Sequence, residues 1–398
     1  MEDLIFLAAL LAFLFGLVSG VARHWPVTAP MVFVAIGILV GPLGLDLFDT
    51  NVESELVQVV AEVTLAVILF TDASTIDLKK LRSEFRIPLR LLAVGLPLTM
   101  VVGLGLALLL YPEFSPWLAA AMAFILAPTD AALGQAVVAN PKVPEAVRDS
   151  ISVESGLNDG IALPPVMVCI AALAAAESLD PGYWTRFAVM QIALGPLAGA
   201  AVGVAGGWLI ENAAARRWMD RSYQRLSAVA LALLCYVLAE LIGGNGFIAA
   251  FFGGLFLTIH SPTVRHRMFE FGEAEGKQLT LFVFLLFGMV LVPAALPFWD
   301  GRALLYAVLS LTVIRMLPVA LSLLGSGLDK TTVAFVGWFG PRGIASVLYL
   351  LMFVHEVGVG GYEPMLSVIA LTVLLSVYAH GLSAVPLAAR YAAHHSDG

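Results

Sequence analysis

The polar residues best suited to chemistry lie close together inside one apolar stretch, 150–176. They occur in the segment Glu154-Ser155-Gly156-Leu157-Asn158-Asp159-Gly160. If this stretch is helical, Glu154 and Asn158 share one face, and Ser155 and Asp159 share the adjacent face. Carboxylate, amide and hydroxyl oxygens suit a hard alkali cation, whereas a transition metal favours His and Cys ligands. Because a carboxylate also accepts protons, such a group can hold either a cation or a proton.

Two further polar groups interrupt apolar stretches at prolines. Pro128, Thr129 and Asp130 follow one another in the stretch 116–139, and add a hydroxyl and a carboxylate to the candidate ligands. The second interruption reads Phe339-Gly340-Pro341-Arg342-Gly343. Proline removes a helical hydrogen bond and kinks or breaks a helix. We therefore expect a broken helix next to a charge at both places, with two ordinary proline kinks as the alternative.

The composition places these residues in a membrane protein. Of the 398 residues, 60% are hydrophobic and 13% are charged, and the mean hydropathy is +0.94. Soluble domains are about 45–50% apolar and about 25% charged, so the composition argues against a soluble enzyme, a nucleic-acid-binding protein and a disordered chain. Cys169 and Cys235 lie in apolar runs, which argues against a disulfide framework or a zinc site. No nucleotide motif occurs, and we expect no cofactor.

Thirteen apolar stretches are candidates for membrane-spanning helices, each of which needs about 20 apolar residues. The candidate spans are 4–22, 27–45, 56–73, 87–111, 116–139, 150–176, 187–211, 226–243, 246–261, 278–297, 303–325, 331–354 and 364–389. The acidic start, Met1-Glu2-Asp3, is unlike the basic start of a secretory signal, so we expect the first span to be retained. The sequence thus predicts one integral membrane domain, 1–398, in an all-α polytopic fold.

The basic residues predict the orientation of these spans. Sixteen of the 21 Lys and Arg residues fall in the loops on one side, and two, Arg186 and Arg302, fall on the other. Cytoplasmic loops carry the excess of Lys and Arg. We therefore expect the N-terminus outside the cell and the C-terminus in the cytoplasm.

The thirteen spans divide into two sets of six around one linking helix. The first set covers about 4–176, the linking helix about 187–211, and the second set about 226–389. The sets begin on opposite sides of the membrane, so if they are structural repeats they are inverted, as in many transporters. Both proline interruptions then fall in the fifth span of their set. Broken backbone at membrane depth is tolerated where it lines a cavity or is buried in protein, which points to a shared site.

Two arginines inside spans require compensation, because an unpaired charge within a membrane is costly. Arg315 lies midway through the eleventh span, and we expect it to form a structural ion pair with Glu154. Arg342 lies at the second interruption, where we expect it to neutralise the facing ends of the broken helices.

At Pro128-Thr129-Asp130 and Glu154–Gly160 the chain resembles the NhaP-like sodium/proton antiporters of the monovalent cation:proton antiporter superfamily, which include the NHE exchangers. The resemblance extends over nearly the whole chain and includes Arg315 and the Gly-Pro-Arg-Gly segment. It implies an NhaA-like antiporter fold, in which the fifth and twelfth spans are unwound and cross at Pro128, Pro341 and Arg342. It also implies a homodimer in a bacterial or archaeal plasma membrane.

The same resemblance implies roles for the candidate site residues. Asp159 would carry the cation or the proton, and Asp130, Thr129 and Ser155 would help to bind Na⁺. Asn158 stands where electrogenic relatives carry a second aspartate, which implies electroneutral exchange. Charge counting agrees independently: if Asp159 alone exchanges its load, the loaded site is neutral with either ion. Two departures, Ala131 after the Thr-Asp pair and Pro341 in place of leucine, can alter backbone positions and so the choice of cation.

The sequence therefore predicts an electroneutral Na⁺(Li⁺)/H⁺ antiporter that uses alternating access at a midplane carboxylate. Exchange of K⁺ for H⁺ is the alternative that the residue types do not separate from it. A cation channel is disfavoured, because a channel needs a repeated filter or rings of charge. A membrane hydrolase is disfavoured because no nucleophile or metal set accompanies the aspartates. The expected partners are Na⁺, Li⁺ or K⁺, H⁺, the lipid bilayer and a second copy of the chain, with no nucleic acid.

Overall fold

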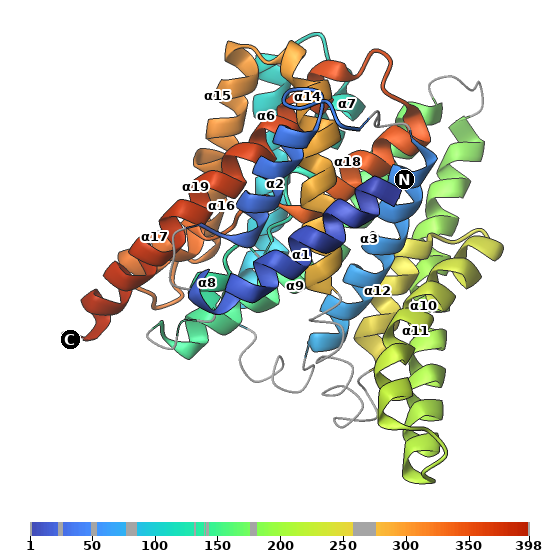
Figure 1. Ribbon diagram of the computed structural model, residues 1–398. Helices are drawn as coiled ribbons and strands as arrows, with labels where there is room; N and C mark the ends of the chain where they lie inside the picture. Colours follow the sequence, from blue (N-terminus) through green and yellow to red (C-terminus); the bar gives the residue numbers. More distant parts are fainter. Residues whose placement is uncertain are drawn as a thin grey trace. The chain divides into compact units, whose positions relative to one another are not determined.

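Every regular element of the described residues is helical. The computed structural model describes residues 2–22, 27–48, 54–76, 86–130, 133–138, 140, 143–175, 181–257 and 276–396. Figure 1 shows these residues as a series of helices joined by short connections. The prediction of an all-α protein with many apolar helices is therefore confirmed.

Apolar helices occur in each of the thirteen predicted spans. Eight are long and apolar enough to cross a membrane: Val57–Thr75, Arg86–Leu110, Glu145–Ala174, Val189–Ala215, Arg221–Leu241, Gly276–Phe298, Gly301–Ser322 and Glu363–His394. Five are shorter: Phe6–Gly20, Ala29–Val40, Pro116–Ile125, Gly246–Leu257 and Ile344–Val357. Residues 131–132, 139, 176 and 258–261 of the predicted spans lie outside the described residues, as do the basic loops 77–85 and 262–275. The number of spans that cross the membrane and their orientation stay predictions.

The described residues form two compact units. The first comprises Met1–Gln58, Arg86–Asn158 and Thr280–Gly398, and the second comprises Val59–Phe85 and Asp159–Leu279. The first unit contains α1 (Glu2–Ala22), α2 (Ala29–Val40), α5 (Arg86–Arg90), η1 (Leu91–Gly95), α6 (Leu96–Leu110), α7 (Pro116–Ile125), α8 (Gln135–Val138), η2 (Phe287–Leu291), α14 (Val292–Ala295), η3 (Leu296–Phe298), α15 (Gly301–Leu311), α16 (Val313–Ser322), α17 (Lys330–Trp338), α18 (Ile344–Val357) and α19 (Glu363–Ser396). The second contains most of α3 (Glu55–Thr75), with α10 (Pro181–Ala215), α11 (Arg221–Leu241) and α12 (Gly246–Leu257). Helix α9 (Glu145–Ala175) continues from the first unit into the second.

Both proline interruptions leave the helical conformation. Helix α7 ends at Ile125, and residues 126–130 are not helical. Helix α17 ends at Trp338, residues 339–343 are not helical, and α18 begins at Ile344. Each predicted span therefore contains a gap in its backbone hydrogen bonds, with Asp130 in the first gap and Arg342 in the second.

Helix α9, which carries the acidic segment, begins at Glu145 rather than near residue 150 as predicted. Proline favours the start of a helix because it needs no partner for the missing N–H group, and Pro144 directly precedes α9. The carbonyl oxygen of Pro144 accepts a hydrogen bond from the N–H group of Val147 at 3.0 Å. The segment 154–160 therefore lies inside the helix and not at its end.

An apolar core of the first unit holds α9 against the broken segments. It joins side chains of η1, α8, α9, α16, α17 and α19, including Val147, Ile151, Phe335 and Phe339. Helix α19 also lies alongside α15 (Figure 1). This packing fixes the start of α9 and the end of α17, which are the elements next to the interruptions.

The loop between α6 and α7 is attached to the start of α15. The guanidinium group of Arg302 donates to a carboxylate oxygen of Glu113 at 2.8 Å and lies over the ring of Tyr111, 4.8 Å from its centroid. The backbone N–H group of Ala303 donates to Asp300, which lowers the pKa of that carboxyl. These contacts hold the start of α7, whose other end is the first interruption.

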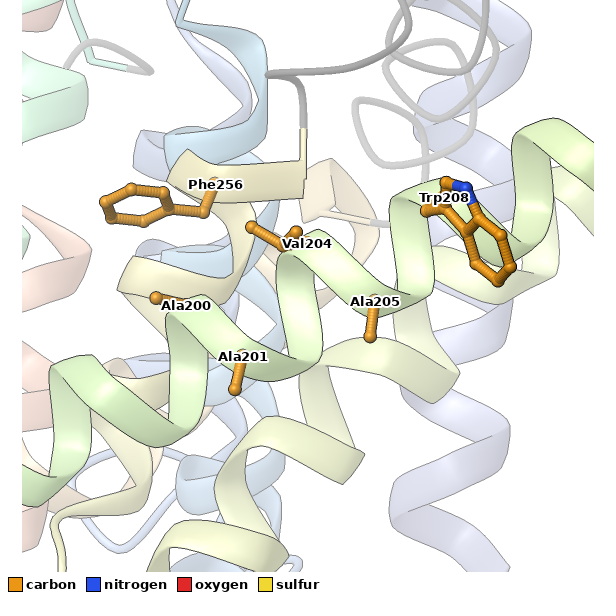
Figure 2. A pocket seen from close by; sticks show the side chains of 6 residues that line it. All are labelled: Ala200, Ala201, Val204, Ala205, Trp208 and Phe256. Atoms are coloured by element: carbon orange, nitrogen blue, oxygen red, sulfur yellow. The ribbon is translucent and has the colours of Figure 1, made fainter.

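Close backbone contacts define the packing inside the second unit. A Cβ atom on Gly199 of α10 would lie 2.1 Å from the carbonyl oxygen of Ala249 in α12, and one on Gly254 of α12 would lie 2.0 Å from that of Phe70 in α3. Small residues allow such approaches between membrane helices. An open apolar groove of about 560 Å³ also runs along α10 (Figure 2). Its lining residues are Ala200, Ala201, Val204, Ala205, Trp208 and Phe256, none of which supplies an oxygen ligand.

We expect Gly37→Val to destabilise the first unit. A Cβ atom at Gly37 in α2 would lie 2.3 Å from the carbonyl oxygen of Leu285, so the larger side chain must push two backbones apart. Overpacking of this kind costs about 1–3 kcal/mol. The melting temperature of the purified protein in detergent measures the effect. Gly105→Val in α6 is the control, because nothing lies within 4 Å of a Cβ atom there; equal melting temperatures for the two variants would contradict the close contact.

Candidate functional site

The polar side chains of the acidic segment of α9 are all buried. The exposed fractions are 1% for Glu154, 4% for Ser155, 1% for Asn158 and 6% for Asp159. Because α9 is continuous here, Asp159 follows Asn158 directly and shares a helical face with Ser155. Two carboxylates and an amide buried within two turns of a helix each need hydrogen-bond or charge partners, because unpaired polar groups are costly to bury.

Three of the predicted ligands form a buried hydrogen-bonded cluster. The side-chain amide of Asn158 donates to the hydroxyl oxygen of Thr129 at 2.7 Å, and the hydroxyl groups of Thr129 and Ser155 lie 3.1 Å apart. The amide oxygen Oδ1 of Asn158 is buried and accepts no hydrogen bond from the described residues. Since the amide hydrogens are directed at Thr129, this oxygen is available as a ligand for a cation.

Asp130 lies at the start of α18, although it is more than 200 residues away in the sequence. Its Oδ2 atom accepts a hydrogen bond from the N–H group of Ile344 at 3.0 Å, and its own N–H group donates to the carbonyl oxygen of Pro341 at 2.8 Å. A Cβ atom on Gly343 would lie 2.1 Å from Oδ2. The glycine is therefore needed so that the carboxylate can reach the N-terminal end of this helix.

Arg342 lies beyond the C-terminal end of α7, as Asp130 lies at the N-terminal end of α18. Its Nη1 atom donates to the carbonyl oxygens of Ala127 and, at 3.2 Å, of Pro128. The hydroxyl group of Ser346 donates to the carbonyl oxygen of Ile125 at 2.7 Å. The orphaned carbonyl groups that follow α7 thus have partners, and the guanidinium group is fully buried.

Each interruption therefore places a charged side chain at a helix end of the other, and the sign of each charge is opposite to that of the helix end. The N-terminal end of a helix carries a partial positive charge and the C-terminal end a partial negative charge. Asp130 lies at the N-terminal end of α18, and Arg342 lies beyond the C-terminal end of α7. Each charge is stabilised by the half-helix of the other segment, so the two segments stabilise each other.

Glu154 and Arg315, predicted to pair, do so in the structure. Nη1 and Nη2 of Arg315 in α16 donate to Oε1 and Oε2 of Glu154 at 2.5 and 2.8 Å. Each residue is only 1% exposed. A Cβ atom on Gly340 would lie 2.1 Å from Nε of Arg315. Gly340, the first glycine of the Gly-Pro-Arg-Gly segment, thus makes room for this ion pair, as Gly343 does for Asp130.

The sequence did not indicate every polar residue that supports these groups. The roles of Gly340 and Gly343 are spatial, and the sequence shows only that they flank Pro341 and Arg342. Ser346 and Ser376 bond to the interruptions from α18 and α19. The only available signal was their occurrence as isolated polar residues in apolar helices, which is common in membrane proteins.

A family model described as "Sodium/hydrogen exchanger, transmembrane" matches residues 9–390 of the chain. Among curated proteins, the K(+)/H(+) antiporter NhaP2 of Shewanella sp. (strain ANA-3) is 26% identical over 385 residues, covering 95% of this chain and 65% of the relative. The Na(+)/H(+) antiporter of Schizosaccharomyces pombe is 26% identical over 357 residues, covering 81% of this chain and 75% of the relative. The chain thus spans about two thirds of the length of such relatives.

The solved structures show the same fold. The sodium proton antiporter MjNhaP1 from Methanocaldococcus jannaschii, solved at pH 8, matches with a TM-score of 0.79 and 18% identity, over 98% of this chain and 99% of the other. A second structure of that antiporter matches with a TM-score of 0.77. The predicted NhaP-like character is confirmed, and the chain belongs to the sodium/hydrogen exchanger family.

Proposed function

We propose that the protein exchanges one Na⁺ or Li⁺ ion for one proton across a cell membrane, as a secondary transporter and not as an enzyme. The observation that carries the proposal is the buried oxygen cluster of Thr129, Ser155 and Asn158. The last of these residues directly precedes Asp159 in α9. Uncharged oxygens can replace part of the water around an alkali cation, and the adjacent carboxylate supplies the charge. Potassium is the second candidate, because relatives that match most of the chain are named K(+)/H(+) antiporters.

In the proposed cycle, cation and proton compete for Asp159. The carboxylate is neutralised by whichever ion it holds, so the loaded site can cross from one side of the membrane to the other. The empty site crosses poorly, because it would carry an uncompensated charge through a region of low dielectric. Asp130, Thr129, Ser155 and Asn158 assist in cation binding. The inverted repeats and the homodimer are part of the proposal, since such repeats supply a rocking element in many transporters.

The environments of two other carboxylates support a stoichiometry of one cation for one proton. Glu154 is neutralised by Arg315, which bonds to both of its carboxylate oxygens. Asp130 lies at the N-terminal end of α18 and accepts a hydrogen bond from its backbone, which compensates its charge. We propose that Asp159 exchanges its load while these two carboxylates keep theirs, so one cation moves for one proton.

Asp159→Ala is expected to abolish exchange, because the variant keeps the oxygen cluster but loses the charge that competes for the two ions. Acridine-orange dequenching in everted membrane vesicles, with Na⁺, Li⁺ and K⁺ added separately, measures it. Dequenching by Na⁺ or Li⁺ that disappears in the variant supports the proposal, and a response to K⁺ alone changes the substrate. Glu356→Gln, an exposed carboxylate of α18, is the control. Full activity of Asp159→Ala would exclude Asp159 as the carrier.

Exchange by the wild-type protein is expected to be independent of the membrane potential, because the site is neutral with either ion. Liposomes with a fixed pH gradient and an imposed potential of either sign provide the measurement. Asn158→Asp adds a second carboxylate and is expected to make the rate respond to the potential. A potential-dependent rate in the wild type would mean that a second group, such as Asp130, also exchanges its load.

The Glu154–Arg315 pair is expected to act in stability and not in binding. Glu154→Gln leaves the guanidinium group of Arg315 buried without a counter-charge, which costs about 3–5 kcal/mol. The melting temperature in detergent should therefore fall, and Glu154→Leu combined with Arg315→Leu should recover part of the loss. If Glu154→Gln keeps the wild-type melting temperature but loses cation exchange, Glu154 is a ligand instead of a structural partner.

A further inference from the structure

Ser376 of α19 contacts the backbone of the second interruption. Its hydroxyl oxygen accepts a hydrogen bond from the N–H group of Arg342 at 2.7 Å, and both residues are fully buried. Arg342 lies in a segment without helical hydrogen bonds, so its N–H group depends on a partner from elsewhere. A hydroxyl group on the neighbouring helix supplies it.

His380 lies one helical turn beyond Ser376 and is also fully buried. Its Nδ1 atom is 3.1 Å from the hydroxyl oxygen of Ser376 and 3.1 Å from the carbonyl oxygen of the same residue. The imidazole ring also packs against the indole of Trp338 at the end of α17, with 4.8 Å between ring centroids. The indole in turn donates to the hydroxyl of Ser383 at 2.9 Å. The imidazole is therefore fixed on two sides, and it restricts the rotation of the Ser376 hydroxyl.

The residues on either side of Arg342 both contact Asp130. The carbonyl oxygen of Pro341 accepts the N–H group of Asp130, and Gly343 lies against its carboxylate. A displacement of the Arg342 backbone must therefore move both contacts of Asp130. The side chain of Arg342 would move with it, away from the carbonyl groups at the end of α7.

We propose that Ser376 and His380 are positioning residues, which hold the backbone of Arg342 and through it place Asp130 for cation binding. The inference rests on the proposed exchange of a cation for a proton. Neither residue touches the bound cation. The hydroxyl oxygen of Ser376 accepts the hydrogen bond from the Arg342 N–H group. His380 holds Ser376 in the rotamer that can accept this bond. Small changes at this position alter the affinity for the cation without removing a ligand.

The test compares Ser376→Ala with Ser367→Ala in the full-length protein reconstituted in liposomes. Ser367 is the matched control, because it lies on the same helix, is fully buried, and its hydroxyl makes no hydrogen bond with the described residues. Rates of Na⁺-, Li⁺- and K⁺-driven proton movement are measured against cation concentration. We expect Ser376→Ala to raise the half-saturating concentration about five- to tenfold, the effect of losing one hydrogen bond of ordinary strength. The maximal rate should stay within about twofold of the wild type.

Two further variants separate positioning from general destabilisation. Ser376→Thr keeps the hydroxyl group and should restore most of the affinity. His380→Asn keeps a polar atom near the place of Nδ1, whereas His380→Leu does not, so only the leucine variant should resemble Ser376→Ala. Combining His380→Leu with Ser376→Ala should add little to either change alone, because both break one chain of contacts.

The outcomes distinguish failure of this inference from failure of the proposed function. If the wild type moves no proton with any of the three cations, the proposed function fails and the inference with it. If the wild type is active and Ser376→Ala has the half-saturating concentration of Ser367→Ala, the positioning role alone is overturned. A fall in maximal rate or in melting temperature with unchanged half-saturating concentration also overturns it, since that pattern describes a purely structural contact.

Discussion

The structure of the candidate site depends on two broken helices, each of which places a charged side chain at a helix end of the other. Asp130 compensates the N-terminal end of α18, and Arg342 compensates the carbonyl groups at the end of α7. Neither interruption is stable in isolation, because each would leave backbone groups and one charge buried without partners. The backbone hydrogen bond between Asp130 and Pro341 joins the two segments directly. Two prolines that would weaken ordinary helices are thus combined into one rigid polar centre.

Helix α9 contributes a second arrangement of charge next to this centre. One of its carboxylates, Glu154, is paired with Arg315, while the neighbouring Ser155 and Asn158 bond to Thr129. Glu154 differs from Ser155 and Asn158 in its bonding partner and not in its burial, since all three side chains are almost completely buried. A carboxylate with a fixed cationic partner cannot accept a mobile cation. In the proposed site the ligand role therefore belongs to the other oxygens of the helix and not to Glu154, and Gly340 makes room for the ion pair.

Much of this arrangement can be predicted from the sequence, for physical reasons that also set the limits. Apolar stretches, prolines and charges within them each have a strong local signature. The helices, both interruptions and the pairing of Arg315 with Glu154 can therefore be predicted from the sequence. The start of α9 was misplaced because Pro144 begins the helix before the apolar stretch does. The contact of Asp130 with Ile344 and the bonds from Ser346 and Ser376 join residues far apart in the chain. No spacing rule within a single sequence reports such contacts, because they depend on the packing of separate helices.

The glycines at the second interruption show why residue types alone do not determine which alkali cation is chosen. Na⁺, Li⁺ and K⁺ are bound by the same oxygen ligands and differ mainly in radius, so discrimination depends on how far apart the oxygens are held. Here the carboxylate of Asp130 is positioned by the backbone of 341–344, and the approach is limited by the missing side chain of Gly343. In the proposed site, any residue that shifts this backbone by a fraction of an ångström changes the ligand spacing without being a ligand. The determinants of selectivity should therefore be sought in the residues that hold the interruption in place, and not only among the oxygens of the cluster.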